Sequence, residues 1–318
     1  MADVFTFGES MVIFQTHEIG NLEDLPQIYQ KVGGAESNFA TGLARLGHKV
    51  SYMSKVGNDP FGRRILKSIR SEGIDTTYFR MMEEAPTGLL FKEQKFSDTM
   101  NVYYYRGASA ASRMEKEDLP EEIFSELKYL HITGVTPALS NSCKELVSEA
   151  IDLARKYKVK IIFDPNIRFK LWDRKEAFTV LNAIADKADY ILAGMEEAAF
   201  LTNQKEIGSI CRTLQTNEQQ VIVIKRGSES TVLYENGNFK EISAVKVNNV
   251  IDPVGAGDAF AAGFVHGLLQ NCHLEQCIRF GNTLGARVIQ QYGDVEGLPS
   301  LVELNEELEN EFTSDVRR

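Results

Sequence analysis

Short apolar runs alternate with amphipathic segments along the chain from Lys128 onward. Residues 129–134 and 159–164 are rich in β-branched and aromatic residues, and apolar residues recur at helical spacing from Leu146 to Tyr157 between them. The same order continues through residues 189–193, 196–201 and 221–225. This alternation predicts an α/β protein with a mainly parallel sheet flanked by helices on both faces, and with ligands beyond the carboxyl ends of the strands.

Two stretches depart from this alternation and predict a small β-sheet outside the main layer. Residues 11–32 are polar and show little helical periodicity, whereas residues 88–94 and 101–106 have the composition of two strands. A separate hairpin is predicted over residues 232–242, because Asn236 and Gly237 form the dipeptide preferred in a two-residue turn.

The composition is that of a folded globular protein. The chain has 318 residues, of which 43% are apolar and 25% charged, enough for one large α/β domain or two smaller ones. The longest nearly apolar stretch, Ala259–Leu269, is well short of the ~20 residues that a membrane-spanning helix needs. The first five residues have no basic region ahead of an apolar run. We therefore expect a cytoplasmic protein with no membrane partner.

The charge of the chain bears on its partners. The 35 basic and 45 acidic side chains give a net charge of −10, which argues against a nucleic-acid partner held by phosphate neutralisation. Any anionic ligand must therefore meet a local basic site. The four cysteines show neither a CxxC pair nor zinc-site spacing, so we expect reduced, structural thiols at Cys143, Cys211, Cys272 and Cys277.

The strongest local signal is the segment Ile251–Phe260, IDPVGAGDAF, where a glycine-rich turn leads into a helix. Gly255, Ala256 and Gly257 would leave backbone N–H groups unpaired at the positive end of the helix dipole, which makes an anion site. Asp258 could then accept a proton from an attacking hydroxyl while these N–H groups hold the charge on a phosphoryl group. The alternative is a tight turn capped by Asp258 with no ligand.

Other phosphate-binding and catalytic motifs are absent from the sequence. There is no Gly-Lys dipeptide, so the chain has no Walker A loop, and the Gly-Ala-Gly turn lacks the third glycine of a dinucleotide fingerprint. Neither HExxH nor GxSxG occurs. These absences disfavour a dehydrogenase, a zinc protease and a serine hydrolase.

A second motif, Gly33–Ala40 (GGAESNFA), opens a predicted helix that ends at Gly47. Paired glycines before a helix let the backbone approach a ligand closely, and Asn38 in the first turn can reach a hydroxyl. A structural capping turn is the alternative. The segment Lys55–Gly62 follows as a strand end and a turn before another helix.

These three segments resemble the signature regions of the ribokinase-like carbohydrate kinases, also called the PfkB family. They occur in the family's order and spacing, and with the α/β pattern between them the resemblance covers nearly the whole chain. It implies a single ribokinase-like domain over residues 1–318 with a small β-sheet lid, formed by insertions at about 11–33 and 88–107. It also implies phosphoryl transfer from ATP, with Mg²⁺, to a sugar hydroxyl.

Within this family the details resemble 2-keto-3-deoxygluconate kinases more than ribokinases or fructokinases. Three segments carry this likeness: Val102–Ala110, Asp164–Trp172 and Leu192–Glu197. In many relatives the last of these reads Asn-x-x-Glu, whereas this chain has Gly194 at the Asn position and keeps Glu197. The departure puts in doubt any detailed metal role for Gly194, and the resemblance assigns the metal to Glu197.

The substrate suggested by the resemblance is a sugar acid, and its carboxylate requires a strong donor. A bidentate arginine is the strongest answer from a single side chain. Arg106 and Arg168 lie on the predicted lid and after a predicted strand end, although either could instead form a surface ion pair. Asp294 is assigned a substrate hydroxyl by the resemblance, with an ordinary loop carboxylate as the alternative.

The sequence therefore predicts an ATP-dependent kinase that phosphorylates the terminal hydroxyl of 2-keto-3-deoxygluconate. Asp258 is the expected base, with Gly255, Ala256 and Gly257 as the anion site. The sugar acid is expected to contact Gly34, Asn38, Tyr104, Arg106, Arg168 and Asp294. The nucleotide is expected to contact Asn166, Lys225, Gly227, Ser230 and Asn282.

Several alternatives stay open at this point. The same fold could serve a fructokinase or a ribokinase, or a sugar-responsive binding protein without turnover. The resemblance leaves open a requirement for a monovalent cation in addition to ATP and Mg²⁺. It also implies a homo-oligomer formed through the lid.

Overall fold

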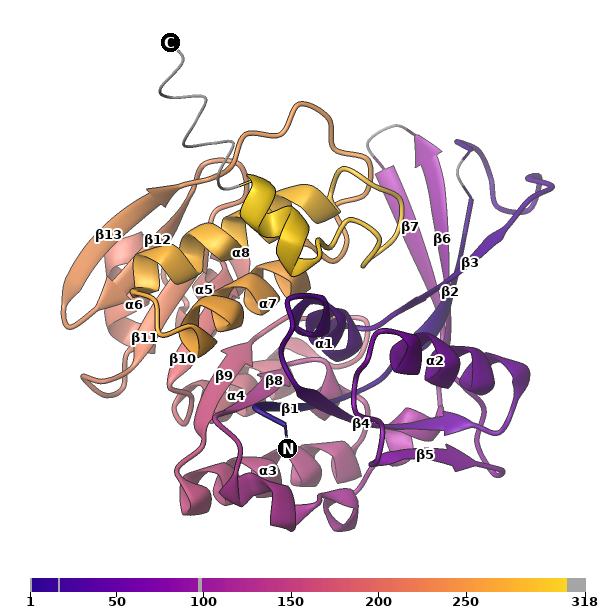
Figure 1. Ribbon diagram of the computed structural model, residues 1–318, viewed down its shortest axis with the longest axis horizontal. Helices are drawn as coiled ribbons and strands as arrows, with labels where there is room; N and C mark the ends of the chain where they lie inside the picture. The colour runs from indigo at the N-terminus through magenta and orange to yellow at the C-terminus, as the bar shows by residue number, and fades with distance from the viewer. Residues whose placement is uncertain (1, 17, 97–98, 308–318) are drawn as a thin grey trace.

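The computed structural model describes residues 2–16, 18–96 and 99–307. Its large sheet is made of the strands β1 (Val4–Phe7), β4 (Val50–Gly57), β5 (Phe79–Met82), β8 (Tyr129–Thr133), β9 (Lys160–Asp164), β10 (Tyr190–Gly194), β11 (Val221–Lys225), β12 (Ser230–Glu235) and β13 (Asn238–Ser243). Their order is β13-β12-β11-β10-β9-β8-β1-β4-β5 (Figure 1). From β5 to β11 every neighbouring pair is parallel, while β12 and β13 form an antiparallel hairpin at one edge. The predicted mainly parallel sheet and the hairpin are confirmed.

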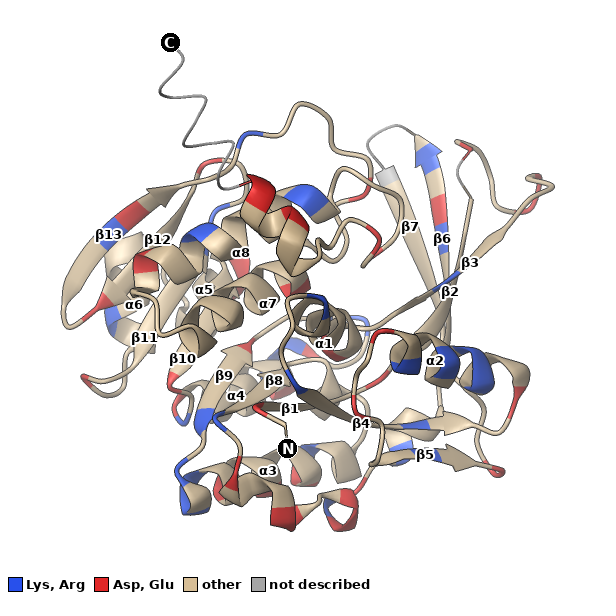
Figure 2. Ribbon diagram, in the orientation of Figure 1, with Lys and Arg blue, Asp and Glu red and all other residues tan. Residues whose placement is uncertain are grey.

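Helices cover both faces of this sheet. One face carries α1 (Ala35–Arg45), α2 (Pro60–Ser71), α7 (Ala256–Leu269) and α8 (Leu274–Val288). The other carries α3 (Asn141–Tyr157), α4 (Arg174–Ala185), α5 (Met195–Thr202) and α6 (Ile207–Leu214). The charged positions of α2 lie on its outer side (Figure 2), while Ile65 and Ile69 are buried.

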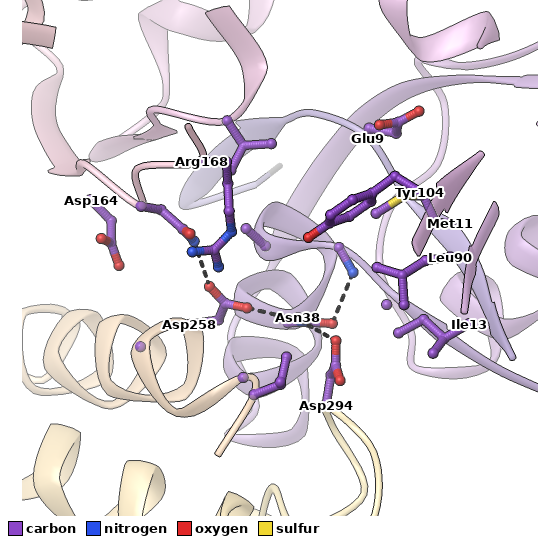
Figure 3. A pocket seen from close by; sticks show the side chains of 18 of the residues that line it. Glu9, Met11, Ile13, Asn38, Leu90, Tyr104, Asp164, Arg168, Asp258 and Asp294 are labelled. Atoms are coloured by element: carbon purple, nitrogen blue, oxygen red, sulfur yellow. Dashed lines mark hydrogen bonds between the residues drawn. The ribbon is translucent and has the colours of Figure 1, made fainter. Parts of the chain in front are cut away.

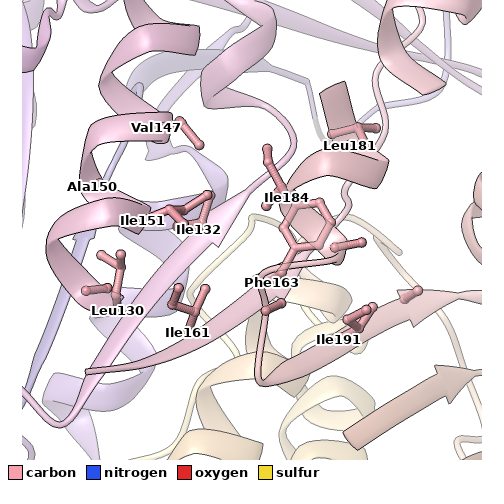
Figure 4. Packing of buried hydrophobic residues seen from close by; sticks show 14 of the residues in the cluster. Leu130, Ile132, Val147, Ala150, Ile151, Ile161, Phe163, Leu181, Ile184 and Ile191 are labelled. Atoms are coloured by element: carbon pink, nitrogen blue, oxygen red, sulfur yellow. The ribbon is translucent and has the colours of Figure 1, made fainter. Parts of the chain in front are cut away.

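Strand alternation explains why both faces are apolar. On β9, Ile161 and Phe163 pack with α3 and α4 in one core, and Ile162 belongs to the core on the opposite face (Figure 4). Successive side chains of a strand point to opposite faces, so a continuous apolar run is what a strand covered on both sides requires.

The small sheet is built from β2 (Met11–Gln15), β3 (Tyr29–Gly33), β6 (Leu89–Phe96) and β7 (Thr99–Tyr105), in the order β3-β2-β6-β7. It stands to one side of the main body (Figure 1). The central pair β2 and β6 is parallel and the outer pairs are antiparallel. Its strands overlap the stretches that broke the α/β alternation, so the predicted small sheet is confirmed, although β3 runs one residue and β6 two residues past the predicted ends, and β7 begins two residues before its predicted start.

The chain passes between the two sheets four times. The connecting segments are residues 8–10, Gly34, residues 83–88 and residues 106–109. The described residues also form four short 3₁₀ helices: η1 (Ala110–Arg113), η2 (Lys116–Asp118), η3 (Glu121–Ser125) and η4 (Thr136–Ala138).

The four cysteines are free thiols. Cys143, Cys211 and Cys277 are buried, and burial raises the pKa of each thiol, to about 11, 11 and 12 respectively. Such thiols are poor nucleophiles, in keeping with a packing role. Among the helices of the described residues, none combines the length and apolar character needed to cross a bilayer.

Candidate active site

Two cavities meet at the amino-terminal end of α7. The inner pocket, of about 370 Å³, lies between the small sheet, the carboxyl ends of β9 and β11, and the first turn of α7. The outer cleft, of about 710 Å³, lies between α7, α8 and the loop that follows β13. Lys225, Pro253 and Gly257 line both cavities. The junction is therefore the place where groups bound in the two cavities can meet.

The turn before α7 has the geometry of an anion site. Gly255 caps the helix with φ of +86°, a left-handed conformation that favours glycine, and a Cβ there would lie 2.5 Å from the carbonyl oxygen of Asp294. The N–H groups in the first turn of a helix have no partner within that helix. Asp252 braces the turn, since its Oδ1 accepts a hydrogen bond from the Val254 N–H at 3.0 Å.

Asp258 lies in the first turn of α7 and lines the inner pocket. Its Oδ2 accepts a hydrogen bond from Asn38 Nδ2 at 2.8 Å, and its Oδ1 accepts one from Asn166 Nδ2 at 3.3 Å (Figure 3). Burial raises the pKa of Asp258 to about 8; nearby Asp164 adds to the rise, and the Asn38 hydrogen bond opposes it. A carboxyl group with a pKa near neutrality is suited to accept a proton.

Most charged side chains around the inner pocket are already paired. Arg106 forms an ion pair with Glu9, whose Oε1 also accepts a hydrogen bond from Ser109 Oγ at 2.5 Å. Lys225 Nζ lies 3.1 Å from Asp164 Oδ2. Arg106 was expected to contact the sugar acid, and the structure places it in the lining of the inner pocket with its charge balanced by Glu9.

Arg168 differs from these paired cations. Among the described residues it makes no ion pair, and its Nη1 donates a long hydrogen bond to the carbonyl oxygen of Ile167 at 3.5 Å. Figure 3 shows its guanidinium directed into the inner pocket toward Asp258. A guanidinium with free donors beside a cavity is a suitable receptor for a carboxylate.

The remaining residues predicted for the sugar are brought together at the inner pocket. Asn38 links two carboxylates, because its Nδ2 also lies 3.5 Å from Asp294 Oδ2. Gly34 caps α1, and a Cβ there would overlap the backbone carbonyl of Glu9, so the close approach needs glycine. Tyr104 lines the pocket from β7, with the Arg106 guanidinium 5.4 Å from its ring centroid.

The residues predicted for the nucleotide divide between the two cavities. Lys225, Gly227 and Asn282 line the outer cleft as expected. Asn166 lines the inner pocket instead. Ser230 does not line the outer cleft: its hydroxyl is engaged with Arg226 and Glu241, and the next residue, Thr231, faces the cleft.

Glu197, predicted for the metal, also lines the inner pocket. Its Oε2 accepts a hydrogen bond from the Gly194 N–H at 2.8 Å and its Oε1 one from the Ile167 N–H at 2.9 Å. The described residues contain no group of three or more acidic, histidine or cysteine side chains arranged to hold a metal. A Mg²⁺ ion bound mainly by phosphates and water needs only one or two carboxylates, so the residues present fit such an ion.

Two residues at this site were not singled out from the sequence. Glu9 balances Arg106, and Lys92 of β6 contacts both Asp252 and Asp294. The alternation along β6 places Lys92 on the same side of the strand as Leu90, which was the available signal.

Comparison with known proteins agrees with this arrangement. The chain is 37% identical over 300 residues to a 2-dehydro-3-deoxygluconokinase of Bacillus subtilis (strain 168), covering 94% of this chain and 93% of that protein. The crystal structure of a PfkB protein from Polaromonas sp. JS666 superposes with a TM-score of 0.87 at 34% identity, covering 96% of this chain and 99% of that one. An uncharacterized sugar kinase from Pyrococcus horikoshii, in complex with ATP, gives a TM-score of 0.83 at 29% identity, covering 95% of this chain and 97% of that one.

The family model for the pfkB family carbohydrate kinases matches residues 1–301. That match spans the small sheet, both cavities and the glycine-rich turn before α7. With its ribokinase-like fold, this chain belongs to the pfkB family of carbohydrate kinases.

Proposed function

We propose that this enzyme is a 2-keto-3-deoxygluconate kinase, which transfers the γ-phosphoryl group of ATP to the terminal hydroxyl of the sugar acid. The observation that carries the proposal is the guanidinium of Arg168, which enters a pocket whose other cations are paired. A neutral sugar would leave this charge without a partner, whereas a sugar acid supplies one. The 37% identity to a 2-dehydro-3-deoxygluconokinase supports the same substrate.

The chemical step uses Asp258 as the base. The substrate's terminal hydroxyl gives its proton to the Asp258 carboxylate, and its oxygen forms a bond to the γ-phosphorus. The bond between that phosphorus and the β,γ-bridging oxygen breaks, and ADP leaves with the electron pair. The N–H groups of Gly255, Ala256 and Gly257 stabilise the negative charge on the transferring group.

The residues of the inner pocket position the acceptor. Arg168 binds the carboxylate, while Asn38, Tyr104 and Asp294 are placed to contact hydroxyl groups. Arg106 can still donate hydrogen bonds to the substrate while its charge is balanced by Glu9, and this ion pair holds both side chains in place in the pocket lining. Gly34 lets the acceptor approach the backbone closely.

The outer cleft is the proposed nucleotide site, with Lys225, Gly227 and Asn282 along its walls. The related sugar kinase solved in complex with ATP supports ATP as the donor. Glu197 would hold Mg²⁺ together with the phosphates, and the ion would neutralise phosphate charge. Asn166 would orient Asp258 from the other side. A need for a monovalent cation is tested by replacing K⁺ with tetramethylammonium in the assay.

The small sheet is the proposed lid of a single kinase domain, acting in the cytoplasm where ATP is available. Closure over the inner pocket would exclude water and so limit ATP hydrolysis. Its outer face is aromatic: Tyr105 is 66% exposed and Tyr103 45% exposed, beside Phe14 and Phe91. We propose that two copies of the chain associate through this face. Sedimentation of the wild type and of Tyr105→Glu tests it, since only the wild type should dimerise.

The experiment that tests the proposed activity is an acceptor panel. ADP release is measured with 2-keto-3-deoxygluconate, its galactonate epimer, fructose and ribose, and the phosphorylated carbon is assigned by NMR. We expect the sugar acids to have the highest kcat/KM. A preference for fructose or ribose would assign a neutral-sugar kinase, and binding without ADP release would assign a sugar-responsive binding protein.

A further inference from the structure

A buried lysine joins the small sheet to the loops around α7. Lys92 lies on β6 with 3% of its side chain exposed, and its Nζ is 3.0 Å from Asp252 Oδ2 and 2.6 Å from Asp294 Oδ1. Figure 2 shows the charged positions along β6, the strand that carries this residue. The ammonium therefore crosses from the small sheet to two carboxylates on the main body.

Both carboxylates belong to the architecture of the anion site. Asp252 holds the turn before α7 through its hydrogen bond with the Val254 N–H. Asp294 packs against Gly255 through its backbone and contacts Asn38 through its carboxylate. Asn38 in turn donates to Asp258. A continuous set of contacts thus leads from Lys92 to the proposed base.

The ammonium is required for the charge balance of this region. Burial alone would lower the pKa of Lys92, but Asp294 and Asp252 outweigh that effect and raise it, so the group stays charged. Removing one partner from a buried ion pair leaves an uncompensated charge, which is strongly unfavourable. Here two carboxylates would be left beside the turn that must receive an anionic phosphoryl group.

We propose that Lys92 is a positioning residue that couples the seating of the small sheet to the anion site and to Asp258. With the sheet seated, its ammonium neutralises Asp252 and Asp294, and Asp294 helps hold the Asn38 amide toward Asp258. With the sheet displaced, Asp252 and Asp294 lose this counter-charge beside the anion site, so phosphoryl transfer is disfavoured until the lid is in place. The inference rests on the proposed kinase function, and it names the residue that makes transfer depend on lid position.

The test compares Lys92→Met with Lys31→Met. Methionine keeps the length of the stem and removes the charge. Lys31 provides a matched control, because it also joins the small sheet to a C-terminal loop, through an ion pair with Glu296 at 2.7 Å, but on the surface. We expect kcat to fall about 5- to 150-fold in Lys92→Met, the range typical of coupling between sites, and to stay near wild type in Lys31→Met.

A charge-balanced variant separates positioning from folding. Lys92→Met with Asp252→Asn removes one of the two stranded carboxylates and should recover much of the melting temperature, measured by circular dichroism. We expect its kcat to stay low, because the link from β6 to Asp294 is still missing. If kcat and melting temperature recover together, Lys92 has a structural role only and the inference is wrong.

Hydrogen exchange supplies a readout that does not depend on turnover. In the free enzyme, the amides of β6 and β7 should exchange faster in Lys92→Met than in the wild type or in Lys31→Met. Unchanged exchange in Lys92→Met would overturn the inference even if no acceptor were phosphorylated. A wild type that is inactive on every acceptor, but shows the faster exchange on substitution, would reject the proposed function and keep the role of Lys92 in seating the sheet.

Discussion

The inner pocket and the outer cleft share the amino-terminal end of α7 but are lined by different types of residue. The inner pocket is lined by charged side chains from the small sheet, strand ends and loops, such as Glu9, Arg106 and Asp164, and these are held in buried ion pairs. The outer cleft is lined largely by glycines and apolar residues, including Val250, Phe260 and Ile289, with Lys225 at its inner end.

This difference indicates how each cavity selects its ligand. A wall of paired charges presents donors and acceptors at fixed positions, so a ligand with a misplaced group leaves a buried polar atom unsatisfied. An apolar cleft gains affinity from contact area and tolerates variation in its lining. We therefore expect substitutions around the inner pocket to be costly and acceptor-specific, and those in the outer cleft to be mild.

The largest effect is expected where the two cavities meet, at Asp258. Asp258→Asn keeps the size of the side chain but removes the proton acceptor, so kcat should fall by about 10²–10⁴ while ADP binding changes little. The measurement is steady-state ADP release together with calorimetric ADP binding.

Thermal melting provides the control for Asp258→Asn. A carboxyl group whose pKa is raised in the folded state binds protons more tightly than in the unfolded chain, so it destabilises the fold as the pH rises toward about 8. The melting temperature of Asp258→Asn at pH 8 should then equal or exceed that of the wild type. Near-normal turnover, or a large loss of stability, would point to a structural cap.

The next effect concerns Arg168 and acceptor choice. Arg168 is exposed in the free enzyme, and losing a hydrogen bond to a charged partner costs about 1.5–3 kcal/mol, so Arg168→Ala should lower kcat/KM clearly on sugar acids and much less on fructose. Arg168→Lys keeps the charge without the planar fork and should also be impaired. Lys170→Ala is a matched control, since Lys170 does not line the inner pocket. If kcat/KM fell equally with acid and neutral acceptors, Arg168 would instead bind the phosphates of the nucleotide or stabilise the fold.

The pH dependence should be governed by the inner pocket. Because the pKa of Asp258 is raised to about 8, this carboxyl group is mostly protonated below that value, and the proposed base is then inactive. We expect kcat/KM for the acceptor to rise about tenfold per pH unit between pH 6 and 7 and to level off above about 8. A profile that is flat across this range would contradict the assignment of Asp258 as the base.

The smallest effect is expected in the outer cleft. Asn282 accepts a hydrogen bond from Thr231 Oγ1 at 2.8 Å and donates to the Ser243 carbonyl at 3.1 Å. Asn282→Ala should cost about 0.5–1.5 kcal/mol, a few-fold rise in the KM for ATP, without a change in the KM for the acceptor. If Asn282→Ala reduced kcat/KM as much as Arg168→Ala does, substitutions in the two cavities would be equally costly, and the expected difference between the cavities would be wrong.

Sequence periodicity was enough to predict the main sheet. β9 shows why, because its apolar run is bounded by a helix on each side and needs no distant partner to be recognised. The glycine-rich turn was also visible, since its conformation is set by neighbouring residues such as Gly255. Both features are local in the chain.

The pairing of charges was not predictable in the same way. Glu9 and Arg106 are 97 positions apart and Lys92 and Asp252 are 160 apart, so only the folded chain brings them together. Ser230 shows a second limit. A shift of one residue along a strand moves a side chain to the other face, and the outer cleft receives Thr231 instead.

The four passages of the chain between the two sheets restrict how this enzyme can be re-engineered. Two of them contain residues that line the inner pocket directly, Glu9 and Gly34, and a third begins with Arg106. A small sheet taken from a relative could not be inserted at a single loop, because it would have to be joined to the main body at four places, and three of these junctions contain residues of the inner pocket. Replacing the whole small sheet would therefore also replace residues of the inner pocket and should change the substrate preference. Chimeras that keep all four connecting segments, and replace only the far ends of the small-sheet strands, should keep the parental substrate.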